Sequence, residues 1–277
     1  MKLGIDFGIT NTDIVLCEGN AKKFYSMPSE QINDEIFYKV SKLIGIDLID
    51  ISKIAVTGGK SSDLPNLYKN ISIVKVNEVE AIGLGAKEVY GFEDKSFVAV
   101  STGTGTACVF GKKNNFTHLG GISIGGGTLQ GISNYLLGTS EINAITDLAK
   151  KGCRKKLDFS IGEVVNEIGN LYPEVTASNF AKAKLNNNHK TEDVAASITN
   201  MIGEVIGTVA YLNALLMNVD KVFFLGRVCK IEPVKNGIID RLNLAGIKGE
   251  FNKSLEYGSA LGALAFLSIN HENNDIK

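Results

Sequence analysis

The pattern of apolar and polar positions predicts short strands alternating with amphipathic helices. Three strands come first, and the chain then continues from Ser29 into a predicted helix whose apolar residues, from Ile32 to Ile44, recur at helical spacing. The strands predicted in the first eighty residues are 2–6, 13–16, 21–27, 54–57 and 71–76. Three strands before the first helix exclude a Rossmann unit, which begins strand, helix, strand.

The second part of the chain repeats this alternation. Strands are predicted at 96–100, 107–110 and 222–226, and helices at 77–90, 125–137, 140–151, 191–216, 231–242 and 257–267. Thr191 caps the longest helix, which spans about 35–40 Å at about 1.5 Å per residue. Its apolar stripe fits core packing as the default, with a contact to a second copy as the alternative. The last helix carries small residues on one side, which predicts close helix packing.

The stretch between the first two strands has the chemistry of a phosphate-binding turn. Asp6 ends the first strand, Gly8 allows the backbone to turn, and Thr10, Asn11 and Thr12 offer hydroxyl, amide and backbone N–H groups. A carboxylate next to such a turn suits a magnesium–phosphate group. The alternative is an ordinary hairpin with an exposed Asp.

A second strand–turn–strand unit follows about 95 residues later, with Ser101-Thr-Gly-Thr-Gly-Thr as its turn. Two such turns suit one polyphosphate bound between two domains. Glycines then cluster from Gly120 to Gly131, and three of them open a helix. Because glycine costs about 1 kcal/mol inside a helix, this density predicts close backbone approach to a partner, and N–H groups at a helix start attract anions. A mobile loop is the alternative.

Two glutamates open the helix at 77–90. Asn77 fits the N-cap, and Glu80 at the third helical position fits a capping box. Glu78 either sits in the helix dipole or points from the helix start into a cleft. The residues by themselves favour the dipole.

Composition excludes several classes of function. The 29 basic and 30 acidic residues leave a net charge of −1, so there is no basic surplus for nucleic acid. The four cysteines are scattered, with no CxxC pair, which disfavours a metal site and favours free thiols in a reducing cytoplasm. We expect no leader sequence and no apolar run of the roughly 20 residues that a bilayer requires.

The motifs, in order, resemble those of the type II pantothenate kinases, in the acetate and sugar kinase/Hsp70/actin superfamily. They are GIDFGITNT, VTGG, VNEVEAIGLGA, STGTGT, GGISIGGGTLQGISNYLLG, ASNFAK, VFFLG and EYGSALGALAFL. The resemblance runs nearly end to end. The glycine-rich stretch at 120–138 and the start of the VNEVEA helix are its most specific parts, since the wider superfamily shares the two turns.

The resemblance implies an α/β protein of two ribonuclease-H-like domains, the actin-like ATPase fold, with a nucleotide cleft between them. Residues 1–90 would form the first domain, and 91–277 the second, with the glycine-rich loop and the long helix. It also implies ATP and Mg²⁺ as cofactors and phosphoryl transfer to pantothenate, the first step toward coenzyme A. A cytoplasmic homodimer built around the long helix is expected, with acyl-CoA as a candidate effector and neither nucleic acid nor membrane as a partner.

Residue roles follow from the same resemblance. Asp6 would hold magnesium through water, and Glu78 would be the catalytic glutamate that orients the substrate hydroxyl and accepts its proton, which reverses the preference for the dipole. His118 and Ser178 would bind substrate beside Glu78. The nucleotide-binding positions would be Gly8, Thr10, Asn11, Gly103, Thr104, Gly105, Gly125, Gly126, Gly127, Gln130 and Gly226.

Two departures from the family pattern bear on activity. The family has a lysine where this chain has Asp13, and an anion there should weaken nucleotide binding unless it faces away. The family also has an arginine where this chain has His118, so a bidentate contact would be lost. Ile9 replaces the family's usual glycine, which is a smaller change. The cations that are candidates to compensate are Lys60, Lys112, Lys113 and Arg227.

Three hypotheses therefore remain. The first is a pantothenate kinase. The second is a kinase of the same fold that acts on another small hydroxyl compound, and the third is a non-catalytic relative that binds nucleotide or acyl-CoA.

Overall fold

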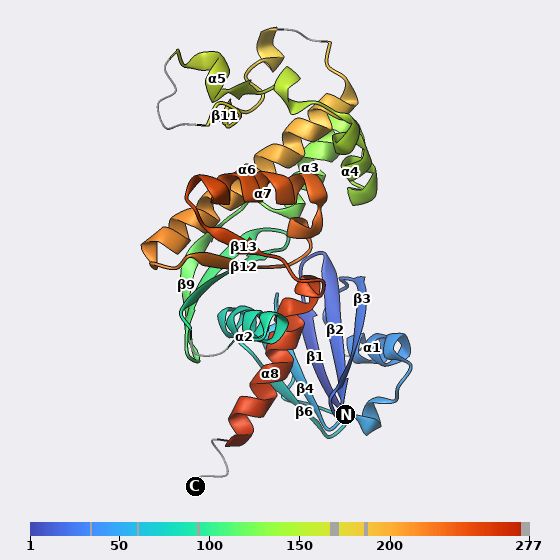
Figure 1. The fold of residues 1–277 in the computed structure, drawn as a ribbon. Helices are drawn as coiled ribbons and strands as arrows, with labels where there is room; N and C mark the ends of the chain where they lie inside the picture. Colours follow the sequence, from blue (N-terminus) through green and yellow to red (C-terminus); the bar gives the residue numbers. More distant parts are fainter. Residues whose placement is uncertain (34, 60, 93–94, 167–171, 186–187, 273–277) are drawn as a thin grey trace.

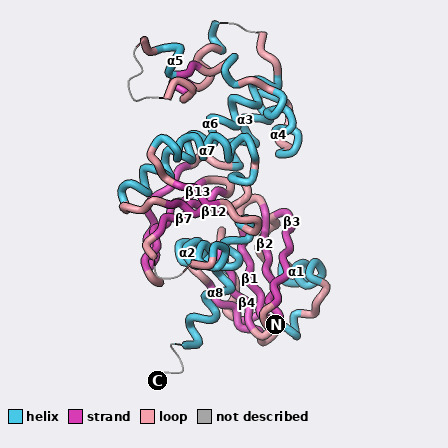
Figure 2. Tube along the Cα trace, viewed as in Figure 1, coloured by secondary structure: helices cyan, strands magenta, loops and turns pink. Residues whose placement is uncertain are grey.

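The computed structural model describes residues 1–33, 35–59, 61–92, 95–166, 172–185 and 188–272. Two mixed α/β units stack in Figure 1, each built on one sheet, and a small lobe projects from the second unit. Figure 2 shows the strands of the two sheets flanked by helices. The predicted two-domain α/β architecture is confirmed.

The first sheet has the strand order β3-β2-β1-β4-β6-β5. Its strands are β1 (Lys2–Phe7), β2 (Asn11–Glu18), β3 (Ala21–Pro28), β4 (Lys53–Thr57), β5 (Leu67–Tyr68) and β6 (Ile71–Lys75). The first three strands are antiparallel, and β4 and β6 then continue parallel to β1. Leu3, Ile5 and Phe7 alternate along β1 and are buried with helix α1 (Ile36–Ile44), as period-two patterning requires.

The second sheet repeats that plan in the order β13-β12-β7-β8-β9. Its strands are β7 (Phe97–Thr102), β8 (Thr106–Lys112), β9 (Asn115–Ile122), β12 (Lys221–Leu225) and β13 (Lys248–Glu250). An antiparallel meander, β7 to β9, again precedes two strands parallel to its first member. The duplicated strand–turn–strand unit read from the sequence is therefore a duplication of the whole sheet plan.

The insertion between β9 and β12 contains the lobe. It holds helices α3 (Gly126–Leu137), α4 (Ile142–Lys151), α5 (Ile161–Val164) and α6 (Thr191–Leu216), with short strands β10 (Phe159–Ser160) and β11 (Thr176–Ser178). Helix α7 (Glu232–Leu244) follows β12. The N-cap of α6 is Lys190, which makes no side-chain cap bond, so the prediction of a Thr191 cap is wrong by one residue.

Among the described helices, α6 alone is long and apolar enough to cross a bilayer, which corrects the expectation that no segment is. However, 61% of its most apolar stretch is buried inside the protein, where it packs on α7, α4 and α3. The helix is therefore a core element of this fold.

Two helices lie between the two sheets, α2 (Glu78–Tyr90) and α8 (Gly258–Glu272), as Figure 1 shows. They cross at glycines: a Cβ on Gly262 would lie 1.8 Å from the Ala81 carbonyl oxygen, and one on Gly85 would lie 2.1 Å from the Gly258 carbonyl oxygen. On its other side α8 packs on β1, where Gly4 leaves room for the helix backbone. The close packing predicted for the last helix is confirmed. Although α8 follows the second sheet in the chain, it packs on the sheet of the first unit, so a division at residue 90 stays a prediction.

Candidate active site

The first predicted phosphate turn joins β1 to β2. Gly8 is required there, because a Cβ would lie 2.7 Å from the Asn11 carbonyl oxygen. Ser29 braces the turn: its hydroxyl donates to the Gly8 carbonyl at 2.5 Å, and its amide donates to the Thr10 carbonyl at 3.0 Å. The prediction that Ser29 starts a helix is therefore wrong. Its polar groups hold the turn, and α1 begins only at Ile36.

The second turn, between β7 and β8, faces the first. Its Gly103 amide donates to the Gly105 carbonyl at 2.9 Å, which closes the turn. The Thr10 and Thr104 hydroxyl oxygens lie 3.0 Å apart. The two turns, 94 residues apart in the chain, thus meet at one place between the two units.

The glycine run packs on this second turn. The Gly126 and Gly127 amides, at the start of α3, donate to the Gly103 and Thr104 carbonyls at 2.8 and 3.0 Å. A Cβ on Gly125 would lie 2.7 Å from the Thr104 carbonyl oxygen. The close backbone approach predicted from the glycines is real, but the partner is the turn. The Gly126 and Gly127 amides are already satisfied, so they are not free to attract an anion as expected.

A cleft of about 830 Å³ opens where the turns meet, a volume typical of small-molecule sites. The predicted residues that line it are Asp6, Gly8, Thr10, Asn11, Glu78, Gly103, Thr104, Gly105, Gly126, Gln130 and Gly226. Gly125 and Gly127 are not among the lining residues, since they pack behind the turn. Most of the predicted site is therefore brought together by the fold.

Asp6 lies at the base of the cleft, at the end of β1. It pairs in register with Asp13 on β2, so two carboxylates are cross-strand neighbours. The turn after β4 closes on Asp6: Gly58 has φ +79°, and a Cβ there would lie 2.2 Å from an Asp6 carboxylate oxygen. Burial, and then the charges of Asp13 and Glu78, raise the pKa of Asp6 to about 7, while Ser259 and Arg227 act in the opposite direction. The surroundings of Asp6 therefore disfavour its ionised form unless a cation lies beside it.

Glu78 occupies the first position of α2. The Asn77 side chain caps the helix by accepting from the Val79 amide at 2.9 Å, as predicted. Glu78 is exposed and lines the cleft, close enough to Asp6 to affect its pKa. The sequence left two interpretations of Glu78, a favourable position in the helix dipole and a side chain in a cleft. Its place in the cleft lining is the one that the second interpretation requires.

Asp13 does not face the cleft as a bare anion. Its carboxylate accepts from both terminal nitrogens of Arg227 at 2.5 Å, and one of those nitrogens also donates to the Ser26 hydroxyl at 2.8 Å. Arg227 follows Gly226 in the second unit, so the pair joins the two units across 214 residues of chain. Of the cations considered as compensation, Lys60 lies outside the described residues, and Lys112 and Lys113 are on the β8–β9 hairpin and do not line the cleft.

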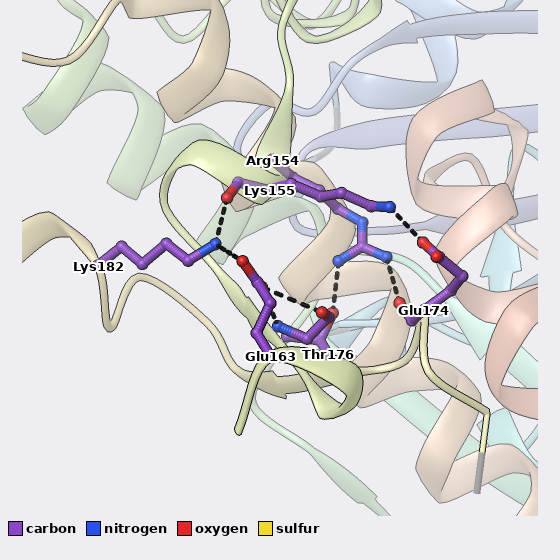
Figure 3. Close-up of polar contacts among 7 residues, drawn as sticks. Arg154, Lys155, Glu163, Glu174, Thr176 and Lys182 are labelled. Atoms are coloured by element: carbon purple, nitrogen blue, oxygen red, sulfur yellow. Dashed lines mark hydrogen bonds and ion pairs between the residues drawn. The ribbon is translucent and has the colours of Figure 1, made fainter. Parts of the chain in front are cut away.

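The other two predicted substrate residues lie outside this cleft. His118 is exposed on β9, which is an edge strand of the second sheet. Ser178 is exposed on β11 in the lobe. Figure 3 shows the polar contacts of this lobe, where Arg154 donates to Thr176, Lys155 pairs with Glu174, and Lys182 pairs with Glu163. Their roles stay predictions, and a single chain does not bring them to Glu78.

Residues that the sequence reasoning did not assign also line the cleft. Gly58 and Gly59 belong to the VTGG motif, and Ser259 belongs to the EYGSAL motif, so a signal for them was present. Arg227 was considered as a compensating cation but not assigned a place. Glu256, which pairs with Lys230 at 2.6 Å, is the first residue of the same EYGSAL motif, but its charge was given no role.

Comparison with known proteins identifies the family of this chain. The Fumble family model matches residues 86–243. A type II pantothenate kinase of Bacillus cereus is 31% identical, over 95% of this chain and 96% of the relative. One of Staphylococcus haemolyticus is 26% identical over 95% of this chain and 99% of the relative.

Solved structures share the fold at low identity. The activator of the 2-hydroxyisocaproyl-CoA dehydratase from Clostridium difficile, with bound ADPNP, has a TM-score of 0.69 at 16% identity and covers 100% of this chain and 98% of its own. A ROK family glucokinase from Streptomyces griseus, in complex with glucose and AMPPNP, has a TM-score of 0.58 at 11% identity, over 96% of this chain and 98% of its own. These likenesses show the fold, and both of those proteins were solved with an ATP analogue bound.

Proposed function

Because the chain belongs to the type II pantothenate kinase (Fumble) family, we propose that it transfers the γ-phosphoryl group of ATP to pantothenate, giving 4'-phosphopantothenate. The single observation that supports this most is the meeting of both phosphate turns with Asp6 and Glu78 in one cleft. Phosphoryl transfer depends mostly on positioning and charge stabilisation, and two facing turns with hydroxyl and backbone N–H groups provide the positioning.

In this proposal Glu78 is the catalytic residue. Its carboxylate is exposed to the cleft at a helix start, where it can accept a hydrogen bond from the acceptor hydroxyl and take its proton late in the reaction. The two turns would bind the polyphosphate through the backbone amides and hydroxyls around Thr10 and Thr104. The glycine run would keep the second turn in shape from behind.

The residues at the base of the cleft fit a magnesium ion. Asp6 has a carboxyl whose ionised form the protein disfavours, with Asp13 and Glu78 nearby, so a divalent cation would stabilise the ionised form. No cluster of three or more potential metal ligands occurs among the described residues. That suits Mg²⁺, which usually binds one or two carboxylates together with substrate phosphates and water. When bound with ATP, the ion would neutralise phosphate charge.

We propose further that the protein is a cytoplasmic homodimer with α6 at its interface. Leu212, Leu215 and Leu216, at the end of that helix, are 52–73% exposed, although large apolar side chains are normally covered. A second copy of the chain would cover them. Regulation by acyl-CoA stays a prediction from the family resemblance.

The test is an assay of ADP release with ATP, Mg²⁺ and pantothenate. We expect Glu78→Gln to lower kcat by about 100-fold or more. Glu80→Gln is the matched control, because Glu80 lies on the same first turn of α2 but does not line the cleft. Its kcat should stay within about twofold of the wild type. Equal activity of the wild type and Glu78→Gln would refute the assignment.

The acceptor is tested separately with a panel that includes a hexose. His118, where the family has arginine, is the reason to consider another hydroxyl compound. Faster turnover of a different acceptor than of pantothenate would favour the second hypothesis. Nucleotide binding without turnover of any acceptor would favour the non-catalytic one.

A further inference from the structure

The cleft is unusually acidic for a site that binds polyphosphate. Its lining contains four carboxylates, those of Asp6, Asp13, Glu78 and Glu256. Among the described lining residues, Arg227 is the only lysine or arginine. A polyphosphate carries several negative charges, so electrostatic complementarity requires cations on the protein in addition to any metal.

Arg227 is held in a defined position with donors to spare. A guanidinium has five N–H donors, and Asp13 and Ser26 accept three of them. The Asp13 side chain is 7% exposed, while that of Arg227 is 37% exposed, so the arginine is fixed from its buried side. Its other two N–H donors have no hydrogen-bond partner among the described residues, and Gly226 and Val228 beside it line the cleft as well.

We propose that Arg227 contacts the polyphosphate and that Asp13 is the positioning residue that holds it there. Asp13 lies on β2, directly after the first phosphate turn, and Arg227 comes from the loop after β12 in the second unit. The pair therefore brings a cation from one unit to the phosphate turn of the other. This inference rests on the proposed nucleotide site, but it is independent of which acceptor is phosphorylated.

The proposal predicts an effect that depends on the phosphates of the ligand. In isothermal titration with MgATP and with adenosine, Asp13→Ala/Arg227→Ala should weaken ATP binding by about tenfold or more, while adenosine binding stays within about twofold. The double variant is used because Arg227→Ala alone leaves a buried carboxylate unpaired. Lys221→Ala is the matched control: Lys221 is an exposed cation at the far end of β12, and its loss should change neither affinity.

The sign of the Asp13→Ala effect separates positioning from simple charge. If Asp13 only repels phosphate, its removal strengthens ATP binding. If it positions Arg227, its removal weakens ATP binding, by several-fold on the same scale. Stronger ATP binding by Asp13→Ala would overturn the positioning role.

A rescue variant completes the test. Asp13→Lys in the Arg227→Ala background returns a cation to this place from the neighbouring strand, and we expect it to recover much of the lost ATP affinity. Equal losses for ATP and adenosine in the double variant, without rescue, would show that the pair is only a structural link and would overturn the contact with phosphate. If the wild type itself fails to bind MgATP, the proposed function fails instead.

Discussion

The crossing of α2 and α8 predicts that Gly262→Ala is strongly destabilising. A Cβ on residue 262 would lie 1.8 Å from the Ala81 carbonyl oxygen and 2.6 Å from the Gly85 amide nitrogen. Real Cβ contacts are essentially never shorter than 3.0 Å, so α8 must move away from α2 by about 1.2 Å, the difference between 3.0 and 1.8 Å. Neither contact atom belongs to a flexible side chain, so the helix itself has to shift.

The magnitude follows from what α8 buries. Leu261, Leu264 and Leu267 are 3–6% exposed, and each contributes about 2 kcal/mol by burial. A gap of about 1 Å forfeits a quarter to a half of such contacts, or about 1.5–3 kcal/mol for the three leucines. Residual overlap adds about 1–3 kcal/mol, and the better helix propensity of alanine returns about 1 kcal/mol. We expect a net loss of about 3 kcal/mol in the free energy of unfolding.

Gly131→Ala is the matched control, because it makes the same chemical change inside helix α3 with opposite surroundings. A Cβ on Gly131 meets nothing within 4 Å, so the alanine should stabilise the protein by about 0.5–1 kcal/mol. Urea denaturation of the two variants measures the difference in their free energies of unfolding, provided that both unfold with the same m-value. If Gly262→Ala is as stable as Gly131→Ala, the close helix crossing is not present in solution.

Three further predictions concern single side chains. Arg227→Ala should lower the free energy of unfolding by about 3 kcal/mol, since it strands the buried Asp13 carboxylate, and Asp13→Ala/Arg227→Ala should recover part of it. Thermal unfolding tests this, and a double variant less stable than the single one contradicts it. Asn77→Ala should cost about 1 kcal/mol through loss of the α2 cap, measured by urea denaturation, whereas an unchanged midpoint would mean that water replaces the cap. Burial raises the pKa of Asp158, so the native state keeps a proton that the unfolded chain loses from about pH 4 upward. Stability should therefore fall as pH rises from about 4 through the folded pKa, and Asp158→Asn should flatten this fall; equal pH profiles of the two proteins would refute it.

The parts of the fold that depend on neighbouring residues could be predicted from the sequence. Alternation along β1, the helical spacing of α6 and the Asn77 cap are set within a few residues of chain. The two strand–turn–strand units could be recognised for the same reason, because a glycine-containing turn between two strands is a local pattern. Together with the family motifs, these features located Asp6, Glu78 and both turns of the candidate site.

Other features were decided only when distant segments met. Ser29 was predicted to start a helix, yet its hydroxyl and amide bind the first turn, a preference that no helical pattern contains. The glycine run predicted that its backbone packs closely against another group, but it did not identify that group. The tertiary structure shows that the group is the turn at 103–105. From the sequence alone, Asp13 was expected to weaken nucleotide binding, because it is an anion beside the phosphate turn. Its neutralisation by Arg227 requires the second unit to fold against the first, because the two residues are 214 positions apart. Local sequence thus determined which elements form, whereas the charge balance of the cleft depended on contacts between units, which a one-dimensional pattern does not encode.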